Sequence, residues 1–261
     1  MISINCYASN PKPAHFHACL QSILTQSYPA WELVLLDDAS VPPLSRYLSE
    51  WGMMDERIHL IRHEENYGML NVHFNWNECL RASRGDLTTA MGSDDIMWPD
   101  RLRKVVEVFA RYPSLDLLHH NALFIDDEGM LLPATYEEQT IKRRWRKDRI
   151  IRTPVGHRGF VDSGERTKIY PQLLNGHNLF AHPTVVMRRS LLDRVGFSEW
   201  GPCGDYQYWI RCAHDRSVII RWLPEDLMSY RMHDGSGCVY GGQTVYDQSM
   251  KMLTYWKEHH L

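Results

Sequence analysis

The amino-acid sequence predicts an α/β fold in which a mostly parallel central sheet is covered by helices on both faces. Three observations predict it. Through the first 112 residues, short apolar runs alternate with segments whose apolar residues recur at helical spacing. The run Leu33–Leu36 is continuously apolar, as buried parallel strands are. Hydrophobic residues make up 44% of the 261 residues, which is enough to form a core.

In the first half, each short apolar run is interpreted as a strand, and each segment with apolar residues three or four apart is interpreted as a helix. Phe16, Cys19, Leu20 and Ile23 define the first helix in this way. Repeated alternation of this kind indicates βαβ units. The predicted order is strand 2–7, helix 14–26, strand 33–36, helix 44–51, strand 58–61, helix 70–83, strand 87–91 and a helix from residue 99.

The second half is less regular. Residues 115–125 are predicted to form one strand or two, 126–129 a turn, and 133–170 no periodic element. Patterning returns with a strand at 184–187, helices at 190–195 and 206–213, a strand-like run at 227–231 and a terminal helix at 245–258. No Gly/Ser-rich or Pro-rich linker separates the halves. We therefore expect one domain over residues 1–261, made of 1–112, 113–240 and a C-terminal helix at 241–261.

Composition limits the function classes. The net charge of −3 gives no overall basic field for a nucleic-acid partner. The six scattered cysteines contain no CxxC pair and are expected to be reduced, packed thiols. No apolar run is long enough to span a membrane, and no secretory signal opens the sequence. These features predict a cytoplasmic protein.

Two adjacent carboxylates, Asp94 and Asp95, follow the predicted strand 87–91. Open α/β sheets place their ligand sites at the carboxyl ends of strands. Hard oxygen ligands suit Mg²⁺ or Mn²⁺, which in turn bind diphosphates. The alternative is a helix-start signal, because acids before a first turn favour the helix dipole.

Several further motifs have the order and spacing of a known family. Together they resemble family 2 glycosyltransferases, which have the GT-A fold, over nearly the whole chain. The resemblance rests on Ile4–Ala8, Ser22–Pro29, Trp31–Ser40, Asn66–Gly68, Asn77–Asp86, Ser93–Asp95, His182–Gly196, Gly204–Arg211 and Tyr230–His233.

The resemblance implies an inverting, metal-dependent transfer of a sugar from a nucleoside diphosphate sugar, of the UDP-linked kind, to a hydroxyl of a glycan or lipid-linked acceptor. Residues 1–112 would bind the donor and 113–240 the acceptor. The resemblance implies that Asp95 and His233 bind the metal and that Asp94 contacts the ribose or the metal. It implies that Asp38 accepts a hydrogen bond from a pyrimidine N3–H and that the ring of Tyr7 stacks on the base. Asp205 would be the general base. Asp37 is expected to support its loop through backbone contacts.

Each role has a structural alternative. Asp205 could be an N-cap, Tyr7 a core residue, and His233 a structural histidine. His182 could contact the acceptor or a phosphate, and Arg101 and Arg231 could reach phosphate or lie on the solvated surface.

The sequence departs from the family pattern at Gly92, Gly204 and Ala8, where the family has Asp, Glu and Asn. A nucleotide-sugar-binding module or inactive homologue is therefore an alternative function. A sugar nucleotidyltransferase is disfavoured, because residues 8–13 lack the Gly-rich, Arg-containing loop of that class. The sequence leaves the oligomeric state open.

A dense basic segment, Lys142–Arg149, has three interpretations: a solvated loop, a site for an anionic acceptor, or peripheral contact with an acidic membrane surface.

Overall fold

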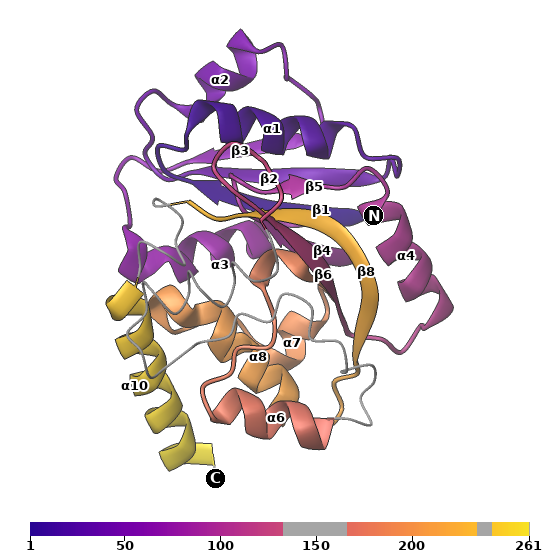
Figure 1. Cartoon of the computed structure of the whole chain (residues 1–261), viewed down its shortest axis with the longest axis vertical. Coiled ribbons are helices and arrows are strands. Elements are labelled where there is room, and N and C mark those ends of the chain that lie inside the picture. Colours follow the sequence, from indigo (N-terminus) through magenta and orange to yellow (C-terminus); the bar gives the residue numbers. More distant parts are fainter. Residues whose placement is uncertain (133–165, 234–241, 261) are drawn as a thin grey trace.

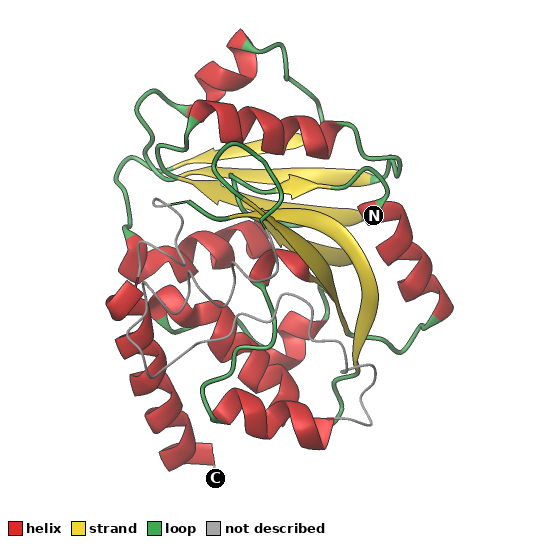
Figure 2. Cartoon of the chain, viewed as in Figure 1, coloured by secondary structure: helices red, strands yellow, loops and turns green. Residues whose placement is uncertain are grey.

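The computed structural model describes residues 1–132, 166–233 and 242–260. An eight-stranded sheet forms its centre, in the order β3-β2-β1-β4-β7-β6-β8-β5, with helices on both faces (Figure 1 and Figure 2). The strands are β1 (Ile2–Ala8), β2 (Trp31–Asp37), β3 (Ile58–Arg62), β4 (Leu87–Met91), β5 (Ile96–Met97), β6 (Leu117–Ile125), β7 (Val185–Arg188) and β8 (Ile220–Arg231). The α-helices are α1 (Pro13–Leu24), α2 (Leu44–Glu50), α3 (Val72–Ala82), α4 (Arg101–Arg111), α6 (Arg166–Leu174), α7 (Leu191–Val195), α8 (Gly204–His214) and α10 (Gly242–His260). Short 3₁₀ helices are η1 (Met69–Asn71), η3 (His182–Thr184) and η4 (Gly201–Cys203).

The first half of the sheet is parallel, as predicted. Strands β3, β2, β1 and β4 run in one direction, with Ala8 opposite Asp37 and Asp37 opposite Arg62. Their carboxyl ends therefore meet at one edge. Beyond β4 the sheet is mixed, because β7 is antiparallel to β4 and β6, β8 is parallel to β6, and β5 is antiparallel to β8.

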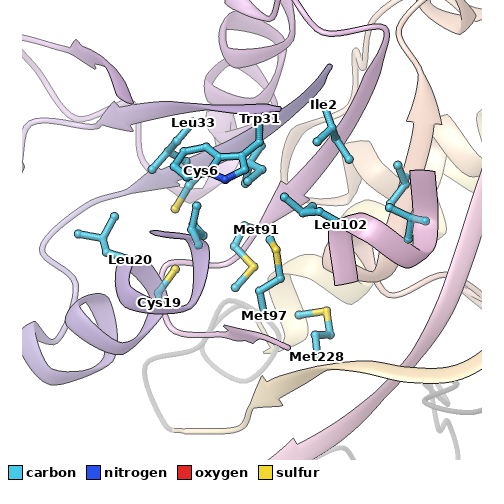
Figure 3. Close-up of a cluster of buried hydrophobic side chains, with 14 of the residues drawn as sticks. Ile2, Cys6, Cys19, Leu20, Trp31, Leu33, Met91, Met97, Leu102 and Met228 are labelled. Atoms are coloured by element: carbon cyan, nitrogen blue, oxygen red, sulfur yellow. The ribbon is translucent and has the colours of Figure 1, made fainter. Parts of the chain in front are cut away.

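The sheet separates two hydrophobic layers. Alternate residues of β2 point to opposite faces, so Leu33 and Leu35 join one cluster while Val34 and Leu36 join another. Helices α1, α2 and α4 cover the first face, where Figure 3 shows Leu20, Met91 and Leu102 in one hydrophobic cluster. Helices α3, α6, α7, α8 and α10 cover the other face. Both faces of β1, β2 and β4 are thus buried, which explains the apolar character of these strands, whereas the edge strand β3 is partly exposed.

Within the predicted region 115–125, residues Leu117–Ile125 form one strand, β6, which is one of the two expected arrangements. The second half differs from the prediction at two elements. Helix α6 lies where no periodic element was expected. Strand β8 begins at Ile220, seven residues before the predicted run. Its first part contains Pro224, followed by two acids, and the partners of β6 jump from Leu223 to Asp226 across this point. Proline has no N–H for a strand ladder, so the register shifts there.

The five cysteines in the described ranges are buried free thiols. Within those same ranges, no helix is long and apolar enough to cross a membrane. The basic segment Lys142–Arg149 lies outside the described residues.

Candidate active site

The site forms where the carboxyl ends of β1, β2 and β4 meet. Tyr7 is the penultimate residue of β1, and Asp38 directly follows β2. The loop after β4 carries Asp94 and Asp95, and the end of β8 joins this loop through Arg231. Tyr7 is half-buried and packs at the margin of the core on the α3 face. The parallel topology thus brings together polar residues that are far apart in the sequence.

The acid loop does not start a helix. Strand β5 separates Asp95 from α4, and the residue before the first turn of α4 is Asp100. The helix-start interpretation of Asp94 and Asp95 is therefore wrong.

Asp95 is buried, with 2% of its surface exposed. Its Oδ1 accepts a hydrogen bond of 2.9 Å from the backbone N–H of Arg231. Burial, helped by the neighbouring charge of Asp94, raises the pKa of the Asp95 carboxyl well above its ordinary value. A cation beside these two acids would favour their ionised forms.

Asp94 faces the end of β8. Its Oδ2 lies 2.8 Å from Nε2 of His233, and the His233 ring centroid lies 5.1 Å from that of His15. Arg231 fixes this arrangement, because its Nε donates to the backbone oxygen of Asp94 and its Nη1 donates to the backbone oxygens of Asp126 and Asp127. Arg231 is therefore a buried residue that connects two loops through hydrogen bonds, and it is not a solvated surface residue.

Asp94 and His233 are a fitting but incomplete set of metal ligands. Among the described residues, no group of three or more His, Cys, Asp or Glu side chains could hold an ion. Mg²⁺ sites commonly use one or two carboxylates and take their remaining oxygens from water and substrate phosphates. Imidazole is also an acceptable ligand for the heavier divalent ions. The pair thus suits an ion that is shared with a bound diphosphate.

Gly92 is required by the packing of the two acids. A Cβ at this position would lie 2.6 Å from Oδ2 of Asp95 and 2.8 Å from Oδ1 of Asp94. Any side chain would therefore displace both carboxylates. The departure from the family pattern at position 92 leaves space for the acids that remain.

Asp38 is the centre of a hydrogen-bond network. Its Oδ1 lies 2.9 Å from Nδ1 of His63 and accepts from the backbone N–H of Tyr67 at 3.0 Å. Its Oδ2 accepts from Nδ2 of Asn75 at 3.0 Å, and its backbone oxygen accepts from Nδ2 of Asn66. A carboxylate offers about four acceptor positions, and these three side-chain contacts occupy all but one of them.

Asp37 supports its loop, as expected. Its carboxylate accepts from the backbone N–H groups of Ser40, at 2.8 Å, and Leu44, at 3.0 Å. Arg62 pairs with the same carboxylate. This holds the connection between β2 and α2 in place beside Asp38.

Asp205 lies in the first turn of α8. The helix begins at Gly204 and its N-cap is Cys203, so the interpretation of Asp205 as the N-cap is wrong. Its Oδ1 accepts a 2.7 Å hydrogen bond from the N–H of Tyr206. Burial raises the pKa of Asp205 to about 6. The carboxylate is therefore ionised at neutral pH but basic enough to accept a proton.

The turn before Asp205 is held by α3. Asn77 makes two hydrogen bonds with the backbone of Ser198, through Nδ2 at 2.7 Å and Oδ1 at 3.1 Å. Gly204 packs against Ser198 and the Cβ of His73, which leaves no room for a side chain. At position 204, where the family has Glu, neighbouring residues thus occupy the space that a side chain would need.

Two basic residues have structural positions. Arg101 is fully buried, and its guanidinium donates to His120 Nε2, Thr89 Oγ1 and the backbone oxygen of Pro183 at 2.6 to 2.8 Å. Both the phosphate and the surface interpretation of Arg101 are therefore wrong. His182 lies against Trp76, and burial lowers its pKa to about 4. His182 is consequently neutral and lines a small pocket with Trp76.

Three polar residues of the network around Asp38, namely His63, Asn75 and Glu78, were not predicted from the sequence. His63 directly follows β3, and the available signal was its position at the same carboxyl edge as Asp38. Asn75 and Glu78 lie on α3, where their polar character alone does not distinguish them from surface residues.

Comparison with known proteins gives the family. Residues 4–196 match the family model described as Glycosyl transferase family 2. The chain is 31% identical over 130 residues to the O-antigen biosynthesis protein RfbC of Myxococcus xanthus, covering 49% of this chain and 10% of that protein.

Two solved structures share the fold. Residues 1–349 of S. aureus TarS in complex with UDP-GlcNAc match with a TM-score of 0.66 at 15% identity, over 97% of this chain and 65% of that one. The mannosyltransferase PcManGT from Pyrobaculum calidifontis, in complex with GDP-Man and Mn²⁺, matches with a TM-score of 0.62 at 14% identity, over 100% of this chain and 64% of that one. The chain spans less than two thirds of each of these three proteins. These likenesses confirm the predicted α/β fold of the GT-A type, and the match over residues 4–196 shows that the chain belongs to glycosyl transferase family 2.

Proposed function

We propose that this chain is a metal-dependent, inverting glycosyltransferase that uses a UDP-linked sugar. One observation carries the proposal. An Asp94–His233 pair suited to a divalent ion lies at the same sheet edge as Asp38 and Tyr7. Asp205, a half-buried acid of raised pKa, lies in the first turn of α8, which packs against α3. Family membership supports this division of roles.

Donor recognition is assigned to Tyr7 and Asp38. An aromatic ring at the end of β1 can stack on a nucleobase. The remaining acceptor position of Asp38 suits the N3–H of a pyrimidine such as uracil. The TarS complex with UDP-GlcNAc supports UDP, whereas the PcManGT complex with GDP-Man makes guanine the competing base to test.

A divalent ion, Mn²⁺ or Mg²⁺, would be held by Asp94 and His233. It would supply Lewis-acid neutralisation of the leaving diphosphate. The contact between Asp94 and His233 favours Asp94 as a metal ligand over Asp94 as a ribose contact. Asp95, predicted to be the ligand, already accepts from Arg231 and is proposed to orient the loop in its present position.

Asp205 is proposed as the general base. Its carboxylate accepts the proton of the acceptor hydroxyl while that oxygen attacks the anomeric carbon. One C–O bond forms as the bond to the diphosphate breaks on the opposite face, which inverts the configuration. A pKa of about 6 suits a base at neutral pH, because the carboxylate is ionised and still accepts protons well.

The acceptor is proposed to be a glycan or a lipid-linked glycan. The match to an O-antigen biosynthesis protein supports this class of acceptor. We further propose that residues 1–112 bind the donor and 113–240 the acceptor, within one domain of 1–261 that acts in the cytoplasm.

The test is a binding panel of UDP, dTDP, CDP and GDP, each with and without Mn²⁺. We expect UDP or dTDP to bind best, with at least a tenfold gain from the metal. Asp94→Asn should remove that gain. Asp86→Asn is the matched control, because Asp86 lies at the other end of β4 and its side chain is 84% exposed. CDP is the sharpest comparison, since cytosine has no N3–H.

Tight CDP binding, or affinity for none of the four, would refute the donor assignment. Hydrolysis of a bound UDP-sugar without acceptor separates an enzyme from a binding module, which would leave the donor intact.

A further inference from the structure

His63 connects two acids from different elements. It follows β3, and its Nδ1 lies 2.9 Å from Oδ1 of Asp38, at the end of β2. Its Nε2 lies 2.9 Å from Oε2 of Glu78, on α3. The His63 side chain is only 8% exposed, and Asp38 is 6% exposed. The three side chains thus form a mostly buried bridge between the sheet and α3.

The bridge indicates the protonation state of His63. A neutral imidazole has one N–H donor and one acceptor nitrogen, whereas an imidazolium has two donors. Both ring nitrogens face carboxylate oxygens, which only accept when ionised. Both contacts are therefore satisfied together only when His63 carries its second proton.

The same network shapes the proposed nucleobase pocket. The ring of Tyr67 stacks on His63 with centroids 4.2 Å apart and planes 27° apart. The backbone N–H of Tyr67 donates to the Asp38 oxygen that His63 also contacts. His63 therefore contributes both to the position of the Asp38 carboxylate and to the path of the chain at Tyr67.

We propose that His63 is a positioning residue for donor recognition, which as an imidazolium holds the Asp38 carboxylate in place for the nucleobase and makes donor affinity depend on pH. This inference rests on the proposed function, because it takes Asp38 as the nucleobase acceptor. His63 acts through Asp38 and does not itself contact the donor.

The charged groups around His63 determine the direction of this dependence. Asp38 and Glu78 face its two nitrogens, and Tyr67 covers its ring. The neighbouring Arg62 is turned to Asp37. Burial lowers the pKa of His63, but the hydrogen bonds to Asp38 and Glu78 outweigh it and raise the pKa above its ordinary value.

The sign follows from this raised pKa. The bridge is complete below the pKa of His63 in the folded protein and loses one of its two hydrogen bonds above it. Donor affinity should therefore fall as the pH rises through that pKa. One hydrogen bond to a neutral partner corresponds to about a two- to tenfold change in affinity.

The experiment measures UDP-GlcNAc affinity by calorimetry at fixed Mg²⁺ from pH 6 to pH 9. This donor is chosen because its diphosphate is esterified at both ends and does not titrate in the range. Four proteins are compared: the wild type, His63→Gln, Glu78→Gln and His59→Gln. His59 is the matched control, because it lies on β3 near the carboxylate of Glu32 but outside the network. The imidazole NMR signal of His63 is followed in parallel.

We expect wild-type affinity to fall about two- to tenfold with rising pH, with the same midpoint as the His63 NMR titration. Glu78→Gln should move both midpoints to lower pH, because it removes one of the two carboxylates. His63→Gln should abolish this pH dependence, and His59→Gln should keep it. Should His63→Gln fail to fold, Glu78→Gln decides, since Glu78 is 38% exposed and its loss leaves the core intact.

Two results would overturn the inference. If UDP-GlcNAc binds but the wild type and Glu78→Gln share one pH profile, His63 has no positioning role and the proposed function stands. If UDP-GlcNAc binds at no pH, the proposed donor is wrong and the inference fails with it.

Discussion

Replacing Asp205 with Asn should change activity and stability in opposite directions: transfer falls, while the stability of the fold is unchanged or increased. Asn keeps the oxygen that accepts the 2.7 Å hydrogen bond from the N–H of Tyr206. It removes the negative charge and the ability to accept a proton. Because Asp205 is not the N-cap of α8, no cap is lost.

The magnitudes follow from the pKa of Asp205. Burial raises it from 3.8 to about 6, and a shift of about two units corresponds to about 3 kcal/mol between the two protonation states. The half-buried position makes this an upper limit, so we expect Asp205→Asn to gain between 0 and about 3 kcal/mol at pH 8. Loss of a positioned general base typically costs about 10² to 10⁴ in rate.

The pH dependence has a defined sign. The folded pKa lies above the unfolded value, so folding takes up a proton between about pH 6 and 3.8. The stability gap between wild type and Asp205→Asn should therefore close as the pH falls through about 6. Wild-type kcat/KM should drop over the same range, because about nine tenths of Asp205 is ionised at pH 7 and about one tenth at pH 5.

Urea denaturation at several pH values, UDP binding and transfer kinetics test this directly. Transfer by Asp205→Asn within a few fold of wild type would refute the base assignment. A large loss of stability would show instead that the carboxylate supports the fold.

The remaining predictions concern Gly92 and Arg101. Gly92→Ala places a Cβ 2.6 Å from Asp95 and 2.8 Å from Asp94, so we expect a loss of about 1 to 3 kcal/mol in denaturation and at least a tenfold weaker metal-dependent donor affinity; unchanged affinity would mean that the two acids move freely. Arg101→Met removes donors from three buried acceptors, and we expect it to destabilise the protein by about 2 to 5 kcal/mol in urea denaturation. A change below about 0.5 kcal/mol would contradict the structural role of Arg101.

The fold of the first half was predictable because local pattern and burial agree there. Strand β4 has the predicted limits, and β1 and β3 differ by one residue each. In β8 the two signals conflict. The Pro224-Glu225-Asp226 segment has weak strand propensity, and pairing with β6 keeps the strand extended. A tertiary contact of that kind is invisible in a single sequence.

The site was predictable only as a set of residues at strand ends. The parallel topology explains why Asp38, Asp94 and Asp95 gather at one edge. The sequence could not show that Asp95 turns inward to Arg231 while Asp94 faces His233, because β8 reaches the loop from 136 residues further along the chain. It also could not show Arg101 as buried, since a charged residue in an amphipathic helix is ordinarily solvated.

Helix α3 connects the two chemical tasks assigned to the site. On its first two turns, Asn75 donates to Asp38 while Asn77 fixes the backbone of Ser198, in the turn that leads to Asp205. His73, on the same helix, fills the space beside Gly204. A displacement of α3 would therefore alter the proposed nucleobase pocket and the position of the proposed base together. The polar residues on the buried face of α3 are thus held by hydrogen bonds to both halves of the molecule. An apolar face would have packed there without fixing the position of Asp38 or of the turn before Asp205.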